Sequence, residues 1–141
     1  MLKNNDKKQE FFRIINQNNT TMEKMNIDQL LQAMSEEFGG EPETMKLLSR
    51  FYEKAVFEHA ANKNFAMAGD KIPPKYKLLL SFAIAAALGS ERCIKTYARV
   101  ALKKGIAKDE LAEALMVARF VKATTVFSDS TTAMDFIVNQ S

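Results

Sequence analysis

The chain has 141 residues, a hydrophobic content of 47% and a net charge of +3 at neutral pH. A chain of this length buries roughly two thirds of its unfolded surface as one ordinary domain, so we expect no second domain. Its single cysteine excludes an internal disulfide, and no apolar signal-peptide core opens the sequence, so the expected compartment is the reducing cytoplasm.

Residues 1–22 are rich in Asn, Lys and Gln and are expected to form a flexible N-terminal arm before one domain over residues 23–141. The arm contains one apolar island, made of Phe11, Phe12, Ile14 and Ile15. Large apolar side chains are unusual in a solvated tail, so we expect the island to pack on the domain or on a neighbouring subunit.

Two helices are predicted next. Asn26 can cap the first, whose apolar residues keep helical spacing up to Gly39 and Gly40. The second should begin at Pro42 and persist to about Ala61, before a loop over residues 62–70. The only histidine, His59, lies near its predicted end and is interpreted as a structural or surface residue. No His, Cys or carboxylate cluster has the spacing of metal ligands, so no metal is expected.

A strongly apolar helix is predicted from Pro74 to Leu88. Between Leu78 and Leu88 no residue is charged, and Ser81 is the only polar side chain. At ~1.5 Å per residue the helix is about 22 Å long, short of the ~30 Å that a membrane crossing needs. We therefore expect a central core helix, buried on every side, and no membrane partner.

The following helix carries the only thiol. Gly89 ends the apolar helix, and Ser90 stands where an N-cap belongs, so its hydroxyl is expected to accept from the backbone N–H of Cys93. The helix then runs to Lys103 and Lys104, and Gly105 can adopt the left-handed closing conformation. Cys93 thus lies in a first turn, where the positive end of the helix dipole favours a thiolate.

Two further helices complete an all-α fold of about six helices. One is expected from about Lys108 to Lys122, after the poor cap Ala107, and the last over residues 123–139. The first of them should turn these residues inward: Leu111, Ala114, Leu115, Ala118 and Val121. Small hydroxyl side chains interrupt the apolar pattern of the last helix, and they indicate either a polar pocket or an exposed helix start. No stretch alternates at period two, which favours the all-α class.

Residues 72–121 resemble the alkylhydroperoxidase D-like and carboxymuconolactone decarboxylase group. The likeness lies in the helix lengths, in the small-residue helix before Gly89, and in the run ALKKGIAKDELAEAL over residues 101–115. The resemblance implies a compact all-α alkylhydroperoxidase D-like domain that assembles as a homo-oligomer, commonly a trimer or a hexamer.

The chemistry of the family matches less closely. Its redox members carry Cys-x-x-Cys, a His four residues later and a Glu on the preceding helix, and those positions here read Ser90, Cys93, Tyr97 and Leu78. In the family, the thiol nearest the His attacks a peroxide or exchanges with a disulfide, while the other thiol resolves the product. The resemblance therefore makes Cys93, Tyr97 and Ser90 the candidate catalytic residues.

Three functions remain open on the sequence. Cys93 can serve a peroxiredoxin-type oxidoreductase, acting on a small-molecule peroxide or a disulfide in a one-cysteine cycle with an external thiol reductant and no cofactor. If Cys93 is instead a small buried apolar residue, the scaffold would be a non-catalytic oligomeric binding protein for a small anionic ligand. The third is a lactone decarboxylase-like enzyme, in which Tyr97 would replace the expected His.

Charge is distributed unevenly along the chain. The segment from Lys71 to Lys104 contains eight basic residues and one acidic residue, Glu91. Its net charge is therefore +7, which leaves a net charge of −4 for the rest of the chain. This excess indicates either a basic surface that attracts anions or an ordinary solvated face of two helices. No nucleic-acid-binding motif is present, so no nucleic acid is expected as a partner.

Overall fold

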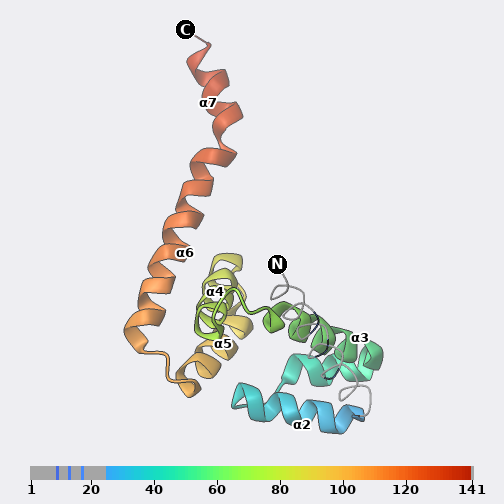
Figure 1. The fold of residues 1–141 in the computed structure, drawn as a ribbon. Coiled ribbons are helices and arrows are strands. Elements are labelled where there is room, and N and C mark those ends of the chain that lie inside the picture. The colour runs from blue at the N-terminus through green and yellow to red at the C-terminus, as the bar shows by residue number, and fades with distance from the viewer. Residues whose placement is uncertain (1–8, 10–12, 14–16, 18–24, 141) are drawn as a thin grey trace. The chain divides into compact units, whose positions relative to one another are not determined.

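The computed structural model describes residues 9, 13, 17 and 25–140. The predicted apolar island (Phe11, Phe12, Ile14 and Ile15) lies outside the described residues. Over residues 25–140 every regular element is an α-helix (Figure 1), which confirms the all-α fold class. The chain divides into two compact units, one ending at Lys77 and the other beginning at Leu78.

The first unit contains α2 (Ile27–Phe38) and α3 (Glu43–Ala68). As predicted, Asn26 caps α2: its Oδ1 accepts from the Gln29 backbone N–H at 2.9 Å, and the Gln29 side chain accepts from the Asn26 N–H at 3.0 Å. This reciprocal pair satisfies two of the backbone donors that a helix start leaves free. The core of the unit is a buried apolar cluster: Leu30, Met34, Val56 and Ala60.

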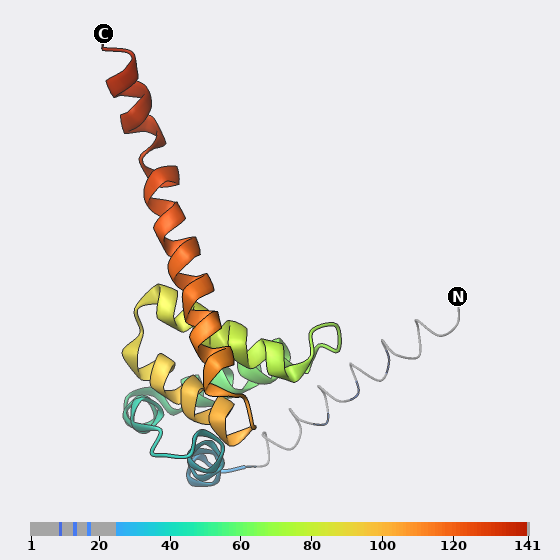
Figure 2. The same ribbon diagram turned by 90° about the vertical axis from the view of Figure 1, so that its left-hand side faces the viewer.

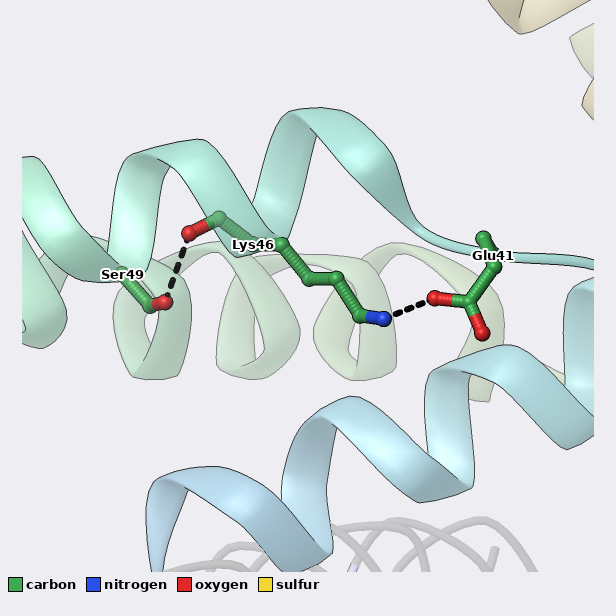
Figure 3. A network of polar contacts seen from close by, with 3 residues as sticks. All are labelled: Glu41, Lys46 and Ser49. Carbon is green, nitrogen blue, oxygen red and sulfur yellow. Dashed lines mark hydrogen bonds and ion pairs between the residues drawn. The ribbon is translucent and has the colours of Figure 1, made fainter.

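The polar contacts described next for the first unit involve exposed or half-buried side chains. Lys63 of α3 pairs with Glu37 of α2, and its ammonium group lies 5.7 Å from the ring centre of Phe38. At the start of α3, Lys46 donates to the Glu41 carboxylate and the Ser49 hydroxyl donates to the Lys46 carbonyl at 2.8 Å (Figure 3). Because exposed ion pairs contribute only ~0–1 kcal/mol, the apolar cluster dominates the packing of α2 on α3.

The extent of α3 corrects the sequence prediction. The helix continues past Ala61 to Ala68, with one interruption at Tyr52, whose φ of −157° and ψ of 90° are not helical. Residues 62–68 contain no Gly or Pro, and asparagine is only mildly unfavourable in a helix. Consequently the helix does not stop at Asn62, and exposed His59 lies well inside it. Lys77 then donates to the Met67 carbonyl at 2.6 Å and to the Gly69 carbonyl, which satisfies acceptors at the end of α3.

The second unit contains most of α4 (Pro74–Leu88), then α5 (Glu91–Lys103), α6 (Lys108–Asp129) and α7 (Thr131–Val138). Its buried core consists of Phe82, Ala101, Ile106 and Leu111. Half-buried residues of α4, α5 and the start of α6 pack against that core. We call these four buried residues the second core.

Left-handed glycines close α4 and α5, as predicted. Gly89 has φ 73° and Gly105 has φ 80°. After α4 the Ser90 N–H donates to the Ala85 carbonyl and the Gly89 N–H to the Ala86 carbonyl, both at 3.1 Å. These bonds form a Schellman motif, and the same pattern recurs around Gly105, where Ile106 lies buried beyond the turn.

The apolar helix α4 is less buried than predicted. Phe82 and Ala85 are buried, but Leu80, Ile84 and Leu88 remain exposed in the single chain, so the prediction of burial on every side was wrong. The helix is short, and its second unit supplies packing only for one side of it. Among the helices of residues 25–140, none combines the length and the apolarity that a membrane crossing requires.

The end of the chain also differs from the prediction. α6 runs beyond Lys122 to Asp129, and Val121, predicted to point inward, is exposed. The hydroxyls of Thr124 and Thr125 donate back to carbonyls of their own helix, at 2.9 Å and 2.8 Å. Such bonds are compatible with an intact helix, so Thr124 and Thr125 do not end α6. Their hydroxyl protons are used within the helix and do not point into a polar pocket.

Candidate active site around Cys93

The three predicted site residues lie on one side of α5. Ser90 precedes the helix, Cys93 is in its first turn and Tyr97 follows four residues later. Residues three and four apart are neighbours on a helix surface, so the thiol lies between the serine and the phenol. The Schellman turn at Gly89 fixes where α5 begins and therefore where these side chains are presented.

The thiol of Cys93 is free and exposed. This exposure argues against the alternative in which the cysteine is a small apolar residue buried within its own chain. Cys93 lies in the first turn of α5, at the helix end that carries backbone N–H groups without an intrahelical partner and the positive end of the helix dipole. Cys93 is thus accessible to a small molecule in an environment suited to a nucleophile.

Tyr97 connects the thiol to the second core. Its half-buried side chain packs against that core together with Leu78 and Ile94. Burial raises the pKa of Tyr97 above its ordinary value of 10.0, and the negative charge on Cys93 raises it further. With a raised pKa the phenol keeps its proton near neutral pH, so it can donate a hydrogen bond but is a poor base.

Ser90 occupies the N-cap position, but its hydroxyl makes no capping hydrogen bond, which corrects the prediction. The backbone angles explain this: φ −88° and ψ 88° depart from the extended conformation that aims an N-cap side chain at the first turn. Ser90 acts instead through its backbone, donating to Ala85 and accepting from the Ile94 N–H at 2.9 Å. Its half-buried hydroxyl is therefore not committed to the cap.

Leu78 lies on α4, where the resemblance places a carboxylate. It is half-buried and contacts the same core as Tyr97. Leu78 and Tyr97 therefore pack on one cluster, and Tyr97 lies one helical turn from Cys93. Leu78 stands where the redox members have a carboxylate, and Tyr97 stands where they have an imidazole.

The site has two further features: the first belongs to the basic excess already noted for residues 71–104, and the second was not found from the sequence. Four exposed cations of α5, Arg92, Lys95, Arg99 and Lys103, recur at spacings of three and four and form a basic stripe along the helix that carries the thiol. Their spacing was the available signal. The second feature is Lys122 of α6, which donates to the Ala87 carbonyl at 2.6 Å, at the end of α4. No local pattern could predict a contact between residues so far apart in the chain.

The donor set suits thiol chemistry. Within residues 25–140 and the three isolated described positions, no group of three or more His, Cys, Asp and Glu side chains lies together to hold a metal ion. What the site offers is one exposed thiol, one protonated phenol and a positive helix start. The thiol can attack an electrophilic oxygen or sulfur atom, and the phenol and the helix start can stabilise the negative charge on the leaving group.

Comparison with known protein families gives a match over a segment that contains α3 to α6 and part of α7. Residues 42–135 match the carboxymuconolactone decarboxylase family, and the match includes Leu78, Ser90, Cys93 and Tyr97. No curated protein matches the chain significantly. Since the matched segment covers well over half of the sequence, this chain belongs to the carboxymuconolactone decarboxylase family.

Proposed function

We propose that this protein is a thiol-dependent peroxidase that works through the single cysteine Cys93. The observation that carries the proposal is the exposure of this thiol in the first turn of α5, one helical turn from a phenol coupled to its charge. Only a thiolate attacks a peroxide at a useful rate, and a helix N-terminus favours that form.

The first half-reaction oxidises the cysteine. The Cys93 thiolate attacks one peroxide oxygen, an S–O bond forms and the O–O bond breaks, so the sulfur loses two electrons and the peroxide gains them. The product is a sulfenic acid, and the departing alkoxide or hydroxide takes a proton from solvent. In this proposal Tyr97 remains protonated and donates a hydrogen bond to the departing oxygen, which stabilises the charge that develops there.

The second half-reaction needs an external thiol, because the chain has no second cysteine. One thiol condenses with the sulfenic acid, releases water and forms a mixed disulfide with Cys93. A second thiol attacks that disulfide, which returns the Cys93 thiol and leaves the reductant oxidised. The same thiolate can attack a disulfide directly, so disulfide exchange is a variant of this function with the same nucleophile.

A second candidate function is the binding of a small anion without thiol chemistry. The basic stripe of α5 favours it, because four exposed cations on one helix side raise the local concentration of anions. The decarboxylase-like function has less support: a raised pKa makes the Tyr97 phenol an unsuitable proton acceptor near neutral pH.

Peroxide consumption tests the proposal. Hydrogen peroxide and an organic hydroperoxide would be offered with dithiothreitol to the parent, to Cys93→Ser and to Thr96→Ser as a control on the same helix. We expect turnover by the parent and by Thr96→Ser, and none by Cys93→Ser. Equal consumption by the parent and Cys93→Ser would refute the function. Anion binding that persists in Cys93→Ser but is lost in Arg99→Ala would favour the second candidate.

A further inference from the structure

The end of α6 and the whole of α7 present an apolar surface that their own chain does not cover. Its residues recur at alternating spacings of four and three, with Ser130 completing the pattern: Met116, Phe120, Ala123, Phe127, Met134 and Ile137. From Arg119 to Gln140 every residue except half-buried Ser130 is exposed, and Phe120 and Phe127 are each 71% exposed. We call these seven residues the C-terminal seam.

The spacing of the seam is that of a helix that packs along another helix. Apolar residues that recur every 3.5 residues on average stay on one side of a helix only if it supercoils gently around a partner. The junction between α6 and α7 is the single residue Ser130, whose φ of −89° and ψ of 0° lie in the right-handed region, and its carbonyl accepts from the Met134 N–H at 2.9 Å, so the apolar spacing continues across it. Figure 2 shows α7 continuing α6 in nearly the same direction, and Figure 1 shows a bend at the junction of the two helices.

The size of the surface is that of an interface. Buried aromatic side chains cover about 150–250 Å² each, so the two seam phenylalanines alone offer on the order of 200–350 Å². The aliphatic seam residues and the exposed flanking valines, Val117, Val126 and Val138, add to that area. The total exceeds the few hundred Å² that a monomer ordinarily leaves exposed and approaches the ~800 Å² per partner of a stable complex.

We propose that the C-terminal seam binds the same seam of a second copy of this chain, antiparallel, about a two-fold axis. Charge supports a self-contact: the positions that flank the seam are valine, threonine and alanine apart from Arg119, so two copies meet without repulsion between ionised groups and no oppositely charged partner is selected. A two-fold contact uses one patch on both copies.

Side-chain size selects the antiparallel direction. Small and large residues alternate along the centre of the seam, in the order Ala123, Phe127, Ser130 and Met134. If the axis passes midway between Phe127 and Ser130, Phe127 of each copy faces Ser130 of the other, and Met134 of each copy faces Ala123 of the other. A parallel pair would set like against like, with overfilled layers of phenylalanine and underfilled layers of alanine and serine.

Light scattering of matched variants tests the contact. Phe127→Glu would place a carboxylate in the seam, whereas Phe136→Glu makes the same change at an exposed phenylalanine of α7 outside it. We expect the mass of Phe127→Glu to fall by half relative to the parent at micromolar concentration, and the mass of Phe136→Glu to be unchanged. An unchanged mass for Phe127→Glu, or a dimer that dissociates only with Ile84→Glu on exposed α4, overturns the proposal.

Disulfide trapping tests the direction and does not require the monomer to fold. In a Cys93→Ser background, Ala123→Cys on a tagged chain and Met134→Cys on an untagged chain would be co-expressed and oxidised. We expect a crosslink between the tagged and untagged chains. We expect none when Ala123→Cys is expressed alone, because in the antiparallel pair residue 123 of one copy lies about 16 Å from residue 123 of the other. A crosslink in Ala123→Cys alone, or equal trapping by the outward position Thr125→Cys, contradicts the antiparallel seam.

Discussion

Tyr97 is the residue whose ionisation the protein visibly alters. Its pKa is raised first by burial and then by the negative charge on Cys93. Replacement of the sulfur should therefore lower the pKa of Tyr97 only in part, since the burial remains. The same two causes keep the phenol protonated beside the thiol, and they make Tyr97 a hydrogen-bond donor at any pH near neutrality.

The raised pKa of Tyr97 predicts a loss of stability at alkaline pH. Above about pH 10 the unfolded chain gives up the phenolic proton that the folded chain still holds. The contribution is thus fully present below pH 10 and is lost as pH rises through the folded pKa. Urea unfolding at a series of pH values should show a shallower alkaline fall for Tyr97→Phe than for the parent.

The control for that measurement is Tyr76→Phe, at a phenol that is 55% exposed. It should leave the alkaline fall as steep as in the parent. A Tyr97→Phe variant with an unchanged alkaline profile would contradict the raised pKa of Tyr97. Phenolate absorbance followed in the parent and in Cys93→Ser would show the part of the shift that belongs to the sulfur.

Three replaced positions separate this chain from the redox members that it resembles. The triple change Leu78→Glu, Ser90→Cys and Tyr97→His should confer dithiol-dependent peroxide reduction beyond that of the parent. Ser90→Cys should cost less than the ~1 kcal/mol of a lost cap, because the Ser90 hydroxyl makes no capping bond. Leu78→Glu should cost ~1–3 kcal/mol, because Leu78 packs on the second core.

Circular dichroism must first show that the triple variant is folded. The double variant Ser90→Cys with Tyr97→His is its control, since it lacks only the new carboxylate. A folded triple variant that forms the disulfide between residues 90 and 93, yet gains no activity over the parent, would refute the carry-over of these positions.

At the scale of the elements, the turn between α4 and α5 determines how the site is presented. Gly89 has a positive φ, and a Cβ there would meet no atom within 4 Å. The expected cost of Gly89→Ala is therefore conformational, about 1–2 kcal/mol. Thermal unfolding should show a lower melting temperature for Gly89→Ala. Gly69→Ala, at a negative φ of −59°, should be neutral or slightly stabilising. Equal effects at the two glycines would contradict this account of the turn.

The helices were largely predictable because their signals are local. The Asn26 cap, the glycine stops and the start of α5 each depend on a few neighbouring residues, and the structure confirms them. The end of α3 was missed because residues 62–70 were assigned to a loop, and the end of α6 was missed because a separate last helix was expected from Ala123. A continuous helix tolerates asparagine, threonine and serine when their side chains are solvated or bond to its backbone.

At the scale of the whole molecule, the family was predictable and the burial was not. The apolar run of α4 predicted a helix buried on all sides, but a single chain supplies packing for only part of it. Tertiary contacts decide which side of an apolar helix is buried by its own chain, and no local sequence pattern encodes those contacts. The arm over residues 1–22 and the homo-oligomer of three or six copies stay predictions.

The arrangement of the three candidate residues along α5 was predictable from local spacing, whereas their catalytic role stays a prediction. Sequence spacing placed Ser90, Cys93 and Tyr97 on one side of α5, and the structure has them there. The exposure of the thiol, the coupling between Cys93 and Tyr97 and the uncommitted Ser90 hydroxyl all depend on packing and on backbone angles. Those are the features that distinguish a nucleophile from a buried apolar cysteine.

The most direct test of the central claim is to follow Cys93 itself through one turnover. Reduced protein would be mixed with one equivalent of hydrogen peroxide, trapped with a sulfenic-acid reagent and weighed intact, beside Cys93→Ser. We expect one trapped adduct on Cys93 in the parent, and none after prior alkylation of the thiol. When the trap is omitted, an external thiol should return the oxidised Cys93 to the thiol. A thiol that stays reduced under these conditions, or an adduct that also appears in Cys93→Ser, would contradict it.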